Sequence, residues 1–168
     1  LPDGIDPENS IVFPAIHGTF GEDGTLQTLL EQGGFYYAGS GPEASRLCMD
    51  KRRSKEVARD AGVRVARDVV FSDPEEIDAN QVLSELGHDL VLKPTDQGSS
   101  VALYVVNGKD ELNDALSAIG RGNWMIECRV FGREVTLGIL RDVPLGVVEV
   151  IPMGGVYDYE RKYSTGTT

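Results

Sequence analysis

The sequence has few of the residues that build metal centres and catalytic triads. It contains two histidines, His17 and His88, and two cysteines, Cys48 and Cys128, and each stands alone in its own context. Since the cysteines form no C-x-x-C pair, free thiols in a reducing compartment are expected. His17 lies near two acids, but no second histidine is close and no serine spacing matches a nucleophile elbow. These absences argue against a zinc site, a disulfide framework and a triad.

Positive charge is also scarce, and long apolar runs are absent. The 16 Lys and Arg residues face 27 Asp and Glu residues, which gives a net charge of −11. This balance argues against binding to nucleic acid or to an anionic membrane surface, although a nucleotide ligand needs only a few local cations. No run reaches membrane-spanning length, and the first residues lack the blocks of a signal peptide. A globular protein of the cytoplasm is expected, and both ends of the chain resemble internal positions of a longer one.

The first 41 residues are predicted to be the end of an α/β unit. The apolar run over residues 11–16 predicts a buried strand that ends at His17 and Gly18. Asp23 is then expected to cap a helix whose Leu26, Leu29 and Leu30 share one face, with glycines at 33 and 34 as its stop.

Residues 42–66 are predicted to be a helical connection. Asp50 is expected to cap a basic helix over residues 51–61, and Gly62 follows where a helix C-terminus commonly places glycine.

From residue 67 the predicted order is strand, helix, strand, strand, helix, strand, strand, strand. Hairpin-like neighbouring strands with segregated helices indicate an α+β layer rather than a doubly wound parallel sheet. The helices are expected to start near Asp73, with proline in the first turn, and at Asp110, with Leu112, Ala115, Leu116 and Ile119 on one face. The strands are expected over residues 67–71, 89–93, 101–106, 124–128, 134–140 and 143–151.

A polar loop between two of these strands is the strongest candidate for a binding site. Lys93 closes the first strand, and the loop that follows offers Gly98 and the hydroxyls of Ser99 and Ser100. Backbone N–H groups, hydroxyls and one lysine can together enclose a polyphosphate. The loop is not a Walker motif, because G-x-x-x-x-G-K-[ST] is absent and no helix follows directly. By itself, a turn rich in serine and glycine is usually only a turn.

Three other positions have a possible function beside an ordinary one. Lys51 begins the basic helix, where a solvated lysine is the default. The strand over residues 124–128 breaks into a linker, and unpaired backbone groups over residues 127–130 would match the edge of an adenine. Glu134 opens an alternating strand on its polar face, where a carboxylate could bind two ribose hydroxyls or simply be exposed.

In this order the segments resemble the D-alanine–D-alanine ligase family of the ATP-grasp superfamily. The resemblance is colinear from about residue 11 to the end of the chain. It is carried by His17 and Gly18, residues 21–27, 39–41, 49–51, 93–94 and 97–101, Glu127, and residues 132–134, 157–160 and 162–163.

The resemblance implies a partial ATP-grasp fold and a role for each matching residue. Residues 1–41 would end the N-terminal substrate domain, 42–66 connect it, 67–151 form the central subdomain, and 152–168 begin an active-site loop. The ATP-binding residues would be Lys51 and Lys93 at the phosphates, Ser100 in the loop above them, Glu127, Cys128, Arg129 and Val130 at the adenine, and Glu134 at the ribose. The catalytic residues would be Ser99 and Tyr163 beside the first D-alanine and Lys162 at the transferred phosphoryl group, while His17 and Glu22 would line the amino-acid site.

The implied reaction joins two D-alanines for peptidoglycan synthesis. ATP phosphorylates the carboxylate of one, and the amine of the second attacks the acyl phosphate. Mg²⁺ or Mn²⁺ would offset the phosphate charge, with ligands expected in a C-terminal part that this sequence lacks, so no metal ligand is assigned here. A homodimer of the complete protein in the bacterial cytoplasm is expected, and this chain by itself is expected to be inactive.

Two alternatives stay open at this point. Another ATP-grasp ligase could use a different acceptor, including a hydroxyl acid. The chain could also be a non-catalytic nucleotide-binding module. The sequence departs from the family at Ala102, where glycine is frequent, and at Cys128 and Arg129, which are unusual for the adenine segment.

Overall fold

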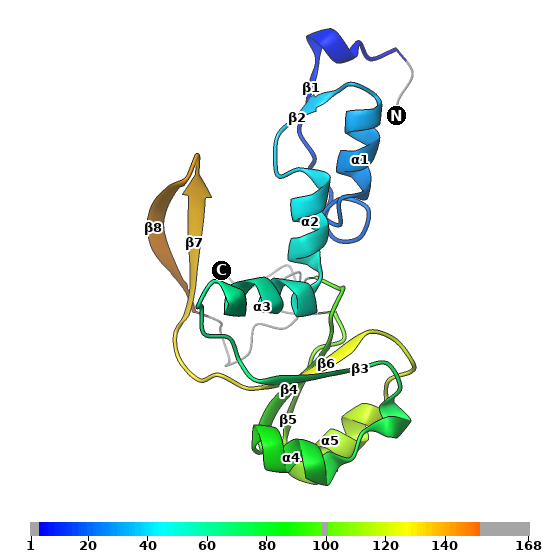
Figure 1. The fold of residues 1–168 in the computed structure, drawn as a ribbon, viewed down its shortest axis with the longest axis vertical. Helices are drawn as coiled ribbons and strands as arrows, with labels where there is room; N and C mark the ends of the chain where they lie inside the picture. Colours follow the sequence, from blue (N-terminus) through cyan, green and yellow to red (C-terminus); the bar gives the residue numbers. More distant parts are fainter. Residues whose placement is uncertain (1–3, 99–100, 152–168) are drawn as a thin grey trace, which may run out of the picture.

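The structure is a computed structural model that describes residues 4–98 and 101–151. Figure 1 shows a four-stranded sheet with α4 and α5 on one face and α3 on the other, while α1 and α2 continue away from α3. In chain order the elements are η1 (Pro7–Asn9), β1 (Ile11–Val12), α1 (Thr25–Gln32), β2 (Tyr36–Tyr37), α2 (Pro42–Met49), α3 (Lys51–Asp60), β3 (Asp68–Phe71), η2 (Pro74–Glu76), α4 (Ala79–Leu86), β4 (Asp89–Pro94), β5 (Tyr104–Asn107), α5 (Gly108–Ser117), β6 (Trp124–Cys128), β7 (Glu134–Leu140) and β8 (Val143–Val150).

The central sheet has the strand order β3-β6-β4-β5, and every neighbouring pair is antiparallel. The predicted α+β layer and its order of elements from residue 67 onward are confirmed. Successive residues of a strand face opposite sides of the sheet. In β4, Leu90 and Leu92 are buried beneath the helices, so Val91 and Lys93 face the side that carries α3.

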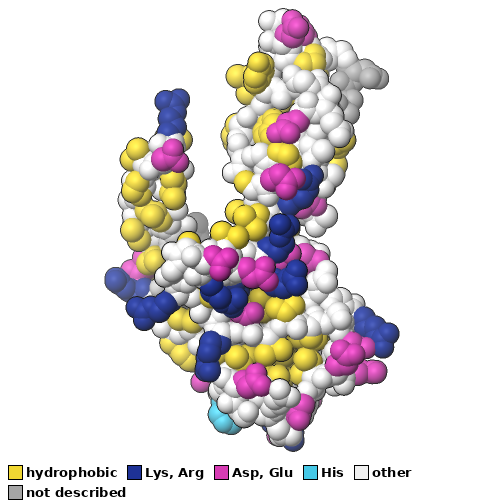
Figure 2. Space-filling view, viewed as in Figure 1, with side chains coloured by type: hydrophobic (Ala, Val, Ile, Leu, Met, Phe, Trp, Pro, Cys, Tyr) yellow, Lys and Arg dark blue, Asp and Glu magenta, His cyan; other side chains and the backbone are white. Residues whose placement is uncertain are grey.

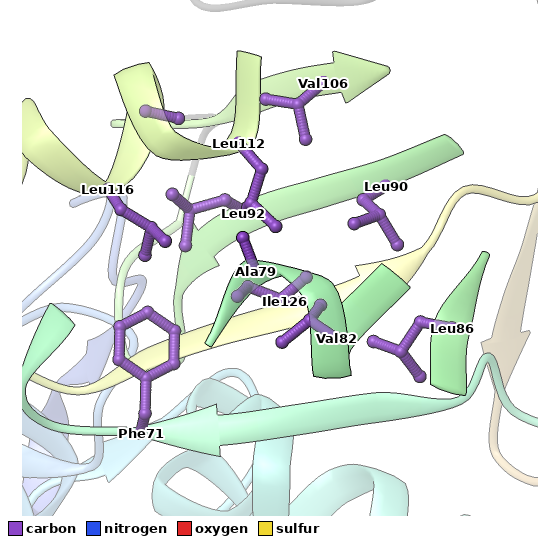
Figure 3. Packing of buried hydrophobic residues seen from close by; sticks show 11 residues of the cluster. Phe71, Ala79, Val82, Leu86, Leu90, Leu92, Val106, Leu112, Leu116 and Ile126 are labelled. Carbon is purple, nitrogen blue, oxygen red and sulfur yellow. The ribbon is translucent and has the colours of Figure 1, made fainter. Parts of the chain in front are cut away.

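The hydrophobic core lies between this sheet and the helices α4 and α5. Figure 3 shows side chains from both helices meeting those of the strands. The α5 residues Leu112, Ala115 and Leu116 are buried, as their spacing predicts. The cluster consists of Phe71, Ala79, Val82, Leu86, Leu90, Leu92, Val106, Leu112, Ala115, Leu116 and Ile126.

Two predicted helix starts are displaced by one to three residues, and a third, at Asp73, begins a short 3₁₀-helix rather than an α-helix. The segment after Asp73 forms only the short η2, and α4 begins at Ala79, where the Asp78 carboxylate accepts from the N–H of Asn80 at 2.8 Å. Asp110 lies inside the first turn of α5. Gly24 precedes α1, and Asp23 instead accepts from the N–H groups of Phe20 and Thr25, so it stabilises the preceding turn. Asx side chains can stabilise either a turn or a helix start.

The first predicted strand is shorter and more exposed than its sequence indicates. Only Ile11–Val12 pairs, in parallel with β2, and Ile11 and Phe13 are 77% and 79% exposed. A two-stranded sheet cannot cover both faces of a strand, and the described part of the chain supplies no other strand beside it.

The connection after α2 follows the prediction closely. The Asp50 carboxylate accepts from the N–H groups of Arg52 and Arg53 at 2.9 and 3.1 Å, so it caps α3 as expected. Gly62, two residues beyond α3, has a φ of +77°, a conformation that favours glycine.

The strands β7 and β8 form a hairpin beside the rest of the fold. Both were predicted, and both faces of the hairpin are exposed within the described part of the chain. Figure 2 shows hydrophobic side chains gathered over this hairpin.

Among the described residues, no helix has both the length and the apolar character needed to cross a membrane.

Candidate functional site

The first side chain of the candidate site is that of Lys93, near the end of β4. It projects from the sheet face that carries α3, because it alternates with the buried Leu92. Its ammonium group is paired with Oε1 of Glu127 on the neighbouring strand β6. The position of Lys93 therefore follows from the strand pattern and one ion pair.

Lys51 reaches the same region from the first position of α3. Its backbone N–H donates to the carbonyl of Thr95 at 2.9 Å, and its ammonium group donates to the carbonyl of Gln97. Burial lowers the pKa of Lys51, and the nearby charge of Lys93 lowers it further. A solvated lysine, the default for an isolated basic helix, is therefore not what the fold produces.

Lys51 and Lys93 line one pocket of about 340 Å³, beside the polar loop. Two like charges held close together, one of them with a lowered pKa, favour an anion between them. The scale and charge of the pocket match a polyphosphate, whose oxygens accept charge-assisted hydrogen bonds. The described lining is Cys48, Met49, Lys51, Lys93, Pro94, Gln97, Gly98, Val101 and Leu103.

A second pocket, of about 300 Å³, adjoins the first, since both are lined by Met49 and Gln97. It carries three carboxylates and one guanidinium, so it offers partners for both an ammonium and a carboxylate of a small zwitterion. Its described lining is Thr19, Asp23, Arg46, Met49, Asp50, Asp96 and Gln97.

The predicted amino-acid residues His17 and Glu22 belong to the loop that borders the second pocket, but they are not part of its lining. Both side chains are exposed. Oε2 of Glu22 accepts from the N–H of Gly18 at 2.6 Å, so Glu22 stabilises the turn that carries His17.

The expectation of unpaired backbone N–H groups after β6 is wrong at two positions. The N–H of Cys128 donates to the carbonyl of Arg67, and that of Arg129 donates to the carbonyl of Asp89, each at 2.9 Å. The reason is that β6 is a central strand, so backbone from both sides pairs with its end. Val130 follows this pairing and is exposed, and Glu134 is exposed at the start of β7.

Four predicted residues lie outside the described residues: Ser99, Ser100, Lys162 and Tyr163.

The sequence prediction missed Lys55 and Asp68. Lys55 lies on α3, and its ammonium group contacts Oδ1 of Asp68 at 2.8 Å and Oε2 of Glu127 at 2.7 Å. Arg59 also pairs with Asp68. The available signal was the spacing, because residues four apart share a helix face and Lys55 follows Lys51 by four.

Glu127 is the acid on which these contacts converge. Burial by itself raises the pKa of its carboxyl, but hydrogen bonds from Lys55 and Lys93 and the charges of both lower it, so the net pKa lies below its ordinary value of 4.5. The Glu127 side chain is therefore an anion held among cations. The sequence prediction instead gave residues 127–130 an adenine-binding role, mainly through their backbone groups.

Within residues 4–98 and 101–151, no group of three His, Cys, Asp or Glu side chains is arranged to hold a metal ion.

Comparison with known proteins identifies the family. The model of the D-ala D-ala ligase C-terminus matches residues 57–168, which is more than half of the chain, and the model of the D-ala D-ala ligase N-terminus matches residues 3–40. The chain belongs to the D-alanine–D-alanine ligase family. The predicted ATP-grasp fold is thereby confirmed for the part of it that this chain contains, while the predicted domain boundaries stay predictions.

Curated relatives of the family match nearly all of this chain but only about half of their own length. A D-alanine–D-alanine ligase of Citrifermentans bemidjiense is 40% identical over 169 residues, which cover 99% of this chain and 54% of that protein. One of Clostridium beijerinckii is 38% identical over 154 residues, which cover 90% of this chain and 51% of that protein. The chain thus spans about half the length of the curated ligases that it matches.

Solved structures of related ligases also resemble this chain over about half of their own length. The ligase of Bacillus anthracis, in complex with ATP, has a TM-score of 0.76 at 32% identity and matches 86% of this chain and 48% of its own. The VanG D-Ala:D-Ser ligase of Enterococcus faecalis has a TM-score of 0.76 at 33% identity and matches 94% of this chain and 47% of its own.

Proposed function

We propose that the protein containing this chain ligates two D-alanines at the expense of ATP, through an acyl phosphate, to supply D-alanyl-D-alanine for peptidoglycan. The observation that carries the proposal is the convergence of Lys51 and Lys93 on one pocket of about 340 Å³. In a family whose Bacillus anthracis member is solved with ATP, two such lysines are suited to the phosphates.

The proposed chemistry follows from the charges of the site. A carboxylate is a poor electrophile, so it needs a phosphoryl group as leaving group. Phosphoryl transfer between anions needs cations that are already in place, and Lys51 and Lys93 would supply two of them. Mg²⁺ or Mn²⁺, when bound, would offset further phosphate charge; its ligands are proposed to lie outside the described residues, which hold no suitable cluster.

The second pocket adjoins the first, which supports a site for the amino acid next to the phosphates. Arg46 lines this pocket and could face a carboxylate of the substrate, while Asp23 and Asp96 could face its ammonium group. His17 and Glu22 would border this site through the loop that contains both, which Glu22 stabilises. The remaining roles also stay proposals: Cys128, Arg129 and Val130 at the adenine, Glu134 at the ribose, Ser100 at the phosphates, and Ser99, Lys162 and Tyr163 around the reacting groups. Because the N–H groups of Cys128 and Arg129 are paired, these two residues would contact the adenine through other groups.

D-Serine is a second candidate acceptor, because a relative that matches 94% of this chain is a D-Ala:D-Ser ligase. Product analysis with mixed D-alanine and D-serine would distinguish the two. We also propose that the full-length protein is a cytoplasmic homodimer.

The test of the nucleotide site uses Lys93→Ala in the full-length protein. Loss of one charge-assisted hydrogen bond of about 1.5–3 kcal/mol should weaken ATP binding about 10- to 150-fold. The matched control is Lys109→Ala, since Lys109 is an exposed lysine of α5 on the opposite face of the sheet. Isothermal titration with ATP measures both variants. If Lys93→Ala binds ATP within about twofold of the wild type, the assignment is wrong.

A further inference from the structure

Two carboxylates lie directly opposite each other on the sheet face below α3. Asp68 of β3 and Glu127 of β6 are paired in register across the antiparallel ladder. Side chains at such a pair are close, and like charges there are destabilising. Lys55 lies between them, at 2.8 Å from Oδ1 of Asp68 and 2.7 Å from Oε2 of Glu127. This side chain therefore makes the opposed pair compatible with the fold.

The two oxygens of Glu127 have different cationic partners. Oε2 contacts Lys55 from α3, and Oε1 contacts Lys93 from β4. The side chains of Lys55 and Glu127 are only 12% and 15% exposed, so water screens these contacts weakly. With both oxygens engaged, the carboxylate has one orientation, and that orientation determines where the Lys93 ammonium group lies.

The charge of this cluster also depends on Lys55. A carboxylate beside Lys93 reduces the positive charge that Lys93 presents to an anion. The ion-paired cluster contains three cations and two carboxylates: Lys55, Arg59 and Lys93 with Asp68 and Glu127. Its net charge of +1 would fall to zero without Lys55. Figure 2 shows basic and acidic side chains interspersed at the level of α3.

We propose that Lys55 is a positioning residue of the nucleotide site: it holds the Glu127 carboxylate, which in turn holds the Lys93 ammonium group at the phosphate pocket. The inference rests on the proposed function of that pocket. The competing explanation is structural, namely that Lys55 serves only to attach α3 to the sheet through Asp68. Arg59 makes a second contact from α3 to Asp68, so attachment of the helix does not depend on Lys55 alone.

The first measurement compares Lys55→Met with wild type in the full-length protein. ATP affinity, measured by isothermal titration, should fall about tenfold, whereas the KM for D-alanine should stay within about twofold. The matched control is Arg53→Met, which removes a charge from an exposed position of the same helix and should leave ATP affinity within about twofold. If Lys55→Met fails to melt cooperatively, Lys55→Gln keeps a polar side chain and takes its place, with the same expected loss.

The second measurement asks whether Lys55 acts through Glu127. In a Glu127→Gln background, Lys55→Met should change ATP affinity by less than about twofold, because the carboxylate that it holds is gone. A purely structural role predicts a lower melting temperature with unchanged ATP affinity. A tenfold loss in both backgrounds would mean that Lys55 acts independently of Glu127. Either result overturns the inference.

The proposed function can fail separately. If wild type does not bind ATP, or Lys93→Ala binds it as wild type does, the phosphate pocket itself is wrongly assigned and the role of Lys55 falls with it. If Lys93→Ala weakens ATP binding and Lys55→Met does not, the pocket stands and only the positioning role is overturned.

Discussion

At the scale of single residues, the site is a set of charges whose ionisation is adjusted by burial and by one another. Lys51 has a lowered pKa because of burial and Lys93, and Glu127 has a lowered pKa because its cationic partners outweigh its burial. Two measurable pH effects follow, one for ligand binding and one for stability.

Binding of ATP should be coupled to proton uptake by Lys51. Phosphate oxygens favour the charged lysine, so they should raise its pKa back toward the ordinary value of 10.5. Protons are taken up wherever the pH lies between the pKa of the free site and that of the occupied site. Titration calorimetry in alkaline buffers of different ionisation enthalpy measures this uptake.

The matched variant for this effect is Lys51→Arg, which keeps the charge but does not titrate in the accessible range. Proton uptake should be smaller in the variant. Equal uptake in both proteins would show that Lys51 does not face the phosphates.

The stability contributed by Glu127 should disappear in acid. Because its folded pKa lies below the ordinary value of 4.5, the stabilisation is complete above that pH and is lost as the pH falls through the folded pKa. Wild type should therefore lose more free energy of unfolding than Glu127→Gln between pH 7 and about pH 3. Urea denaturation at both values measures the difference between the proteins, which removes the shared effect of other carboxylates. Parallel pH curves would contradict the assignment.

At the scale of elements, the junction between α1 and α2 depends on a glycine. Gly24 has a φ of +85°, and a Cβ added there would lie 2.3 Å from the carbonyl oxygen of Pro42. Gly24→Ala should therefore lower the free energy of unfolding by about 3 kcal/mol, from both left-handed strain and backbone overlap. Urea denaturation of the full-length protein provides the value.

The variant Gly34→Ala separates the effect of left-handed strain from that of backbone overlap. Gly34 has a φ of +72°, but no described atom lies within 4 Å of an added Cβ. This variant should lose only about 1–2 kcal/mol, the contribution of the left-handed backbone. Equal losses at the two positions would show that contact with α2 contributes nothing.

The elements that the sequence predicts correctly are those whose pattern and burial agree. The spacing of Leu112, Ala115 and Leu116 matches the face that α5 buries, and the strands from β3 to β8 occur in the predicted order. The failures have local causes. Asp23 stabilises a turn rather than capping α1, and Asp73 caps only a three-residue 3₁₀-helix. Residues 11–16 are apolar without the neighbouring strands that would bury them.

For the candidate site, the sequence predicts which positions matter better than what each side chain contacts. Lys93 is indicated by its place at a strand end, and the structure brings Lys51 beside it. The four-residue spacing from Lys51 places Lys55 on the same face of α3, but its partners Asp68 and Glu127 are far away in the chain, so this spacing does not reveal them. The backbone pairing of Cys128 and Arg129 depends on strand order, which is likewise a property of the whole sheet.

At the scale of the whole molecule, the described part of the chain has one well-packed core and one exposed apolar element. The core unites the sheet with α4 and α5, whereas the β7–β8 hairpin exposes valine, leucine and isoleucine side chains on both faces. Large exposed apolar surfaces are usually covered by another part of a protein or by a partner. Both faces of the β7–β8 hairpin are therefore exposed, whereas both faces of the central sheet carry helices.

A last prediction for the whole molecule concerns whether the 168-residue chain can catalyse the proposed reaction by itself. It spans about half the length of the curated ligases that it matches, and its described residues include no cluster of three potential metal ligands. Phosphoryl transfer needs positioned cations at both the attacking and leaving oxygens, and two lysines supply only part of them. The isolated chain should therefore release no phosphate from ATP in a D-alanine-dependent way when Mg²⁺ is present.

The full-length protein under identical conditions is the positive control, and circular dichroism checks that the isolated chain is folded. Phosphate release by the folded isolated chain that rises with D-alanine concentration would show that these residues already contain a complete catalytic site.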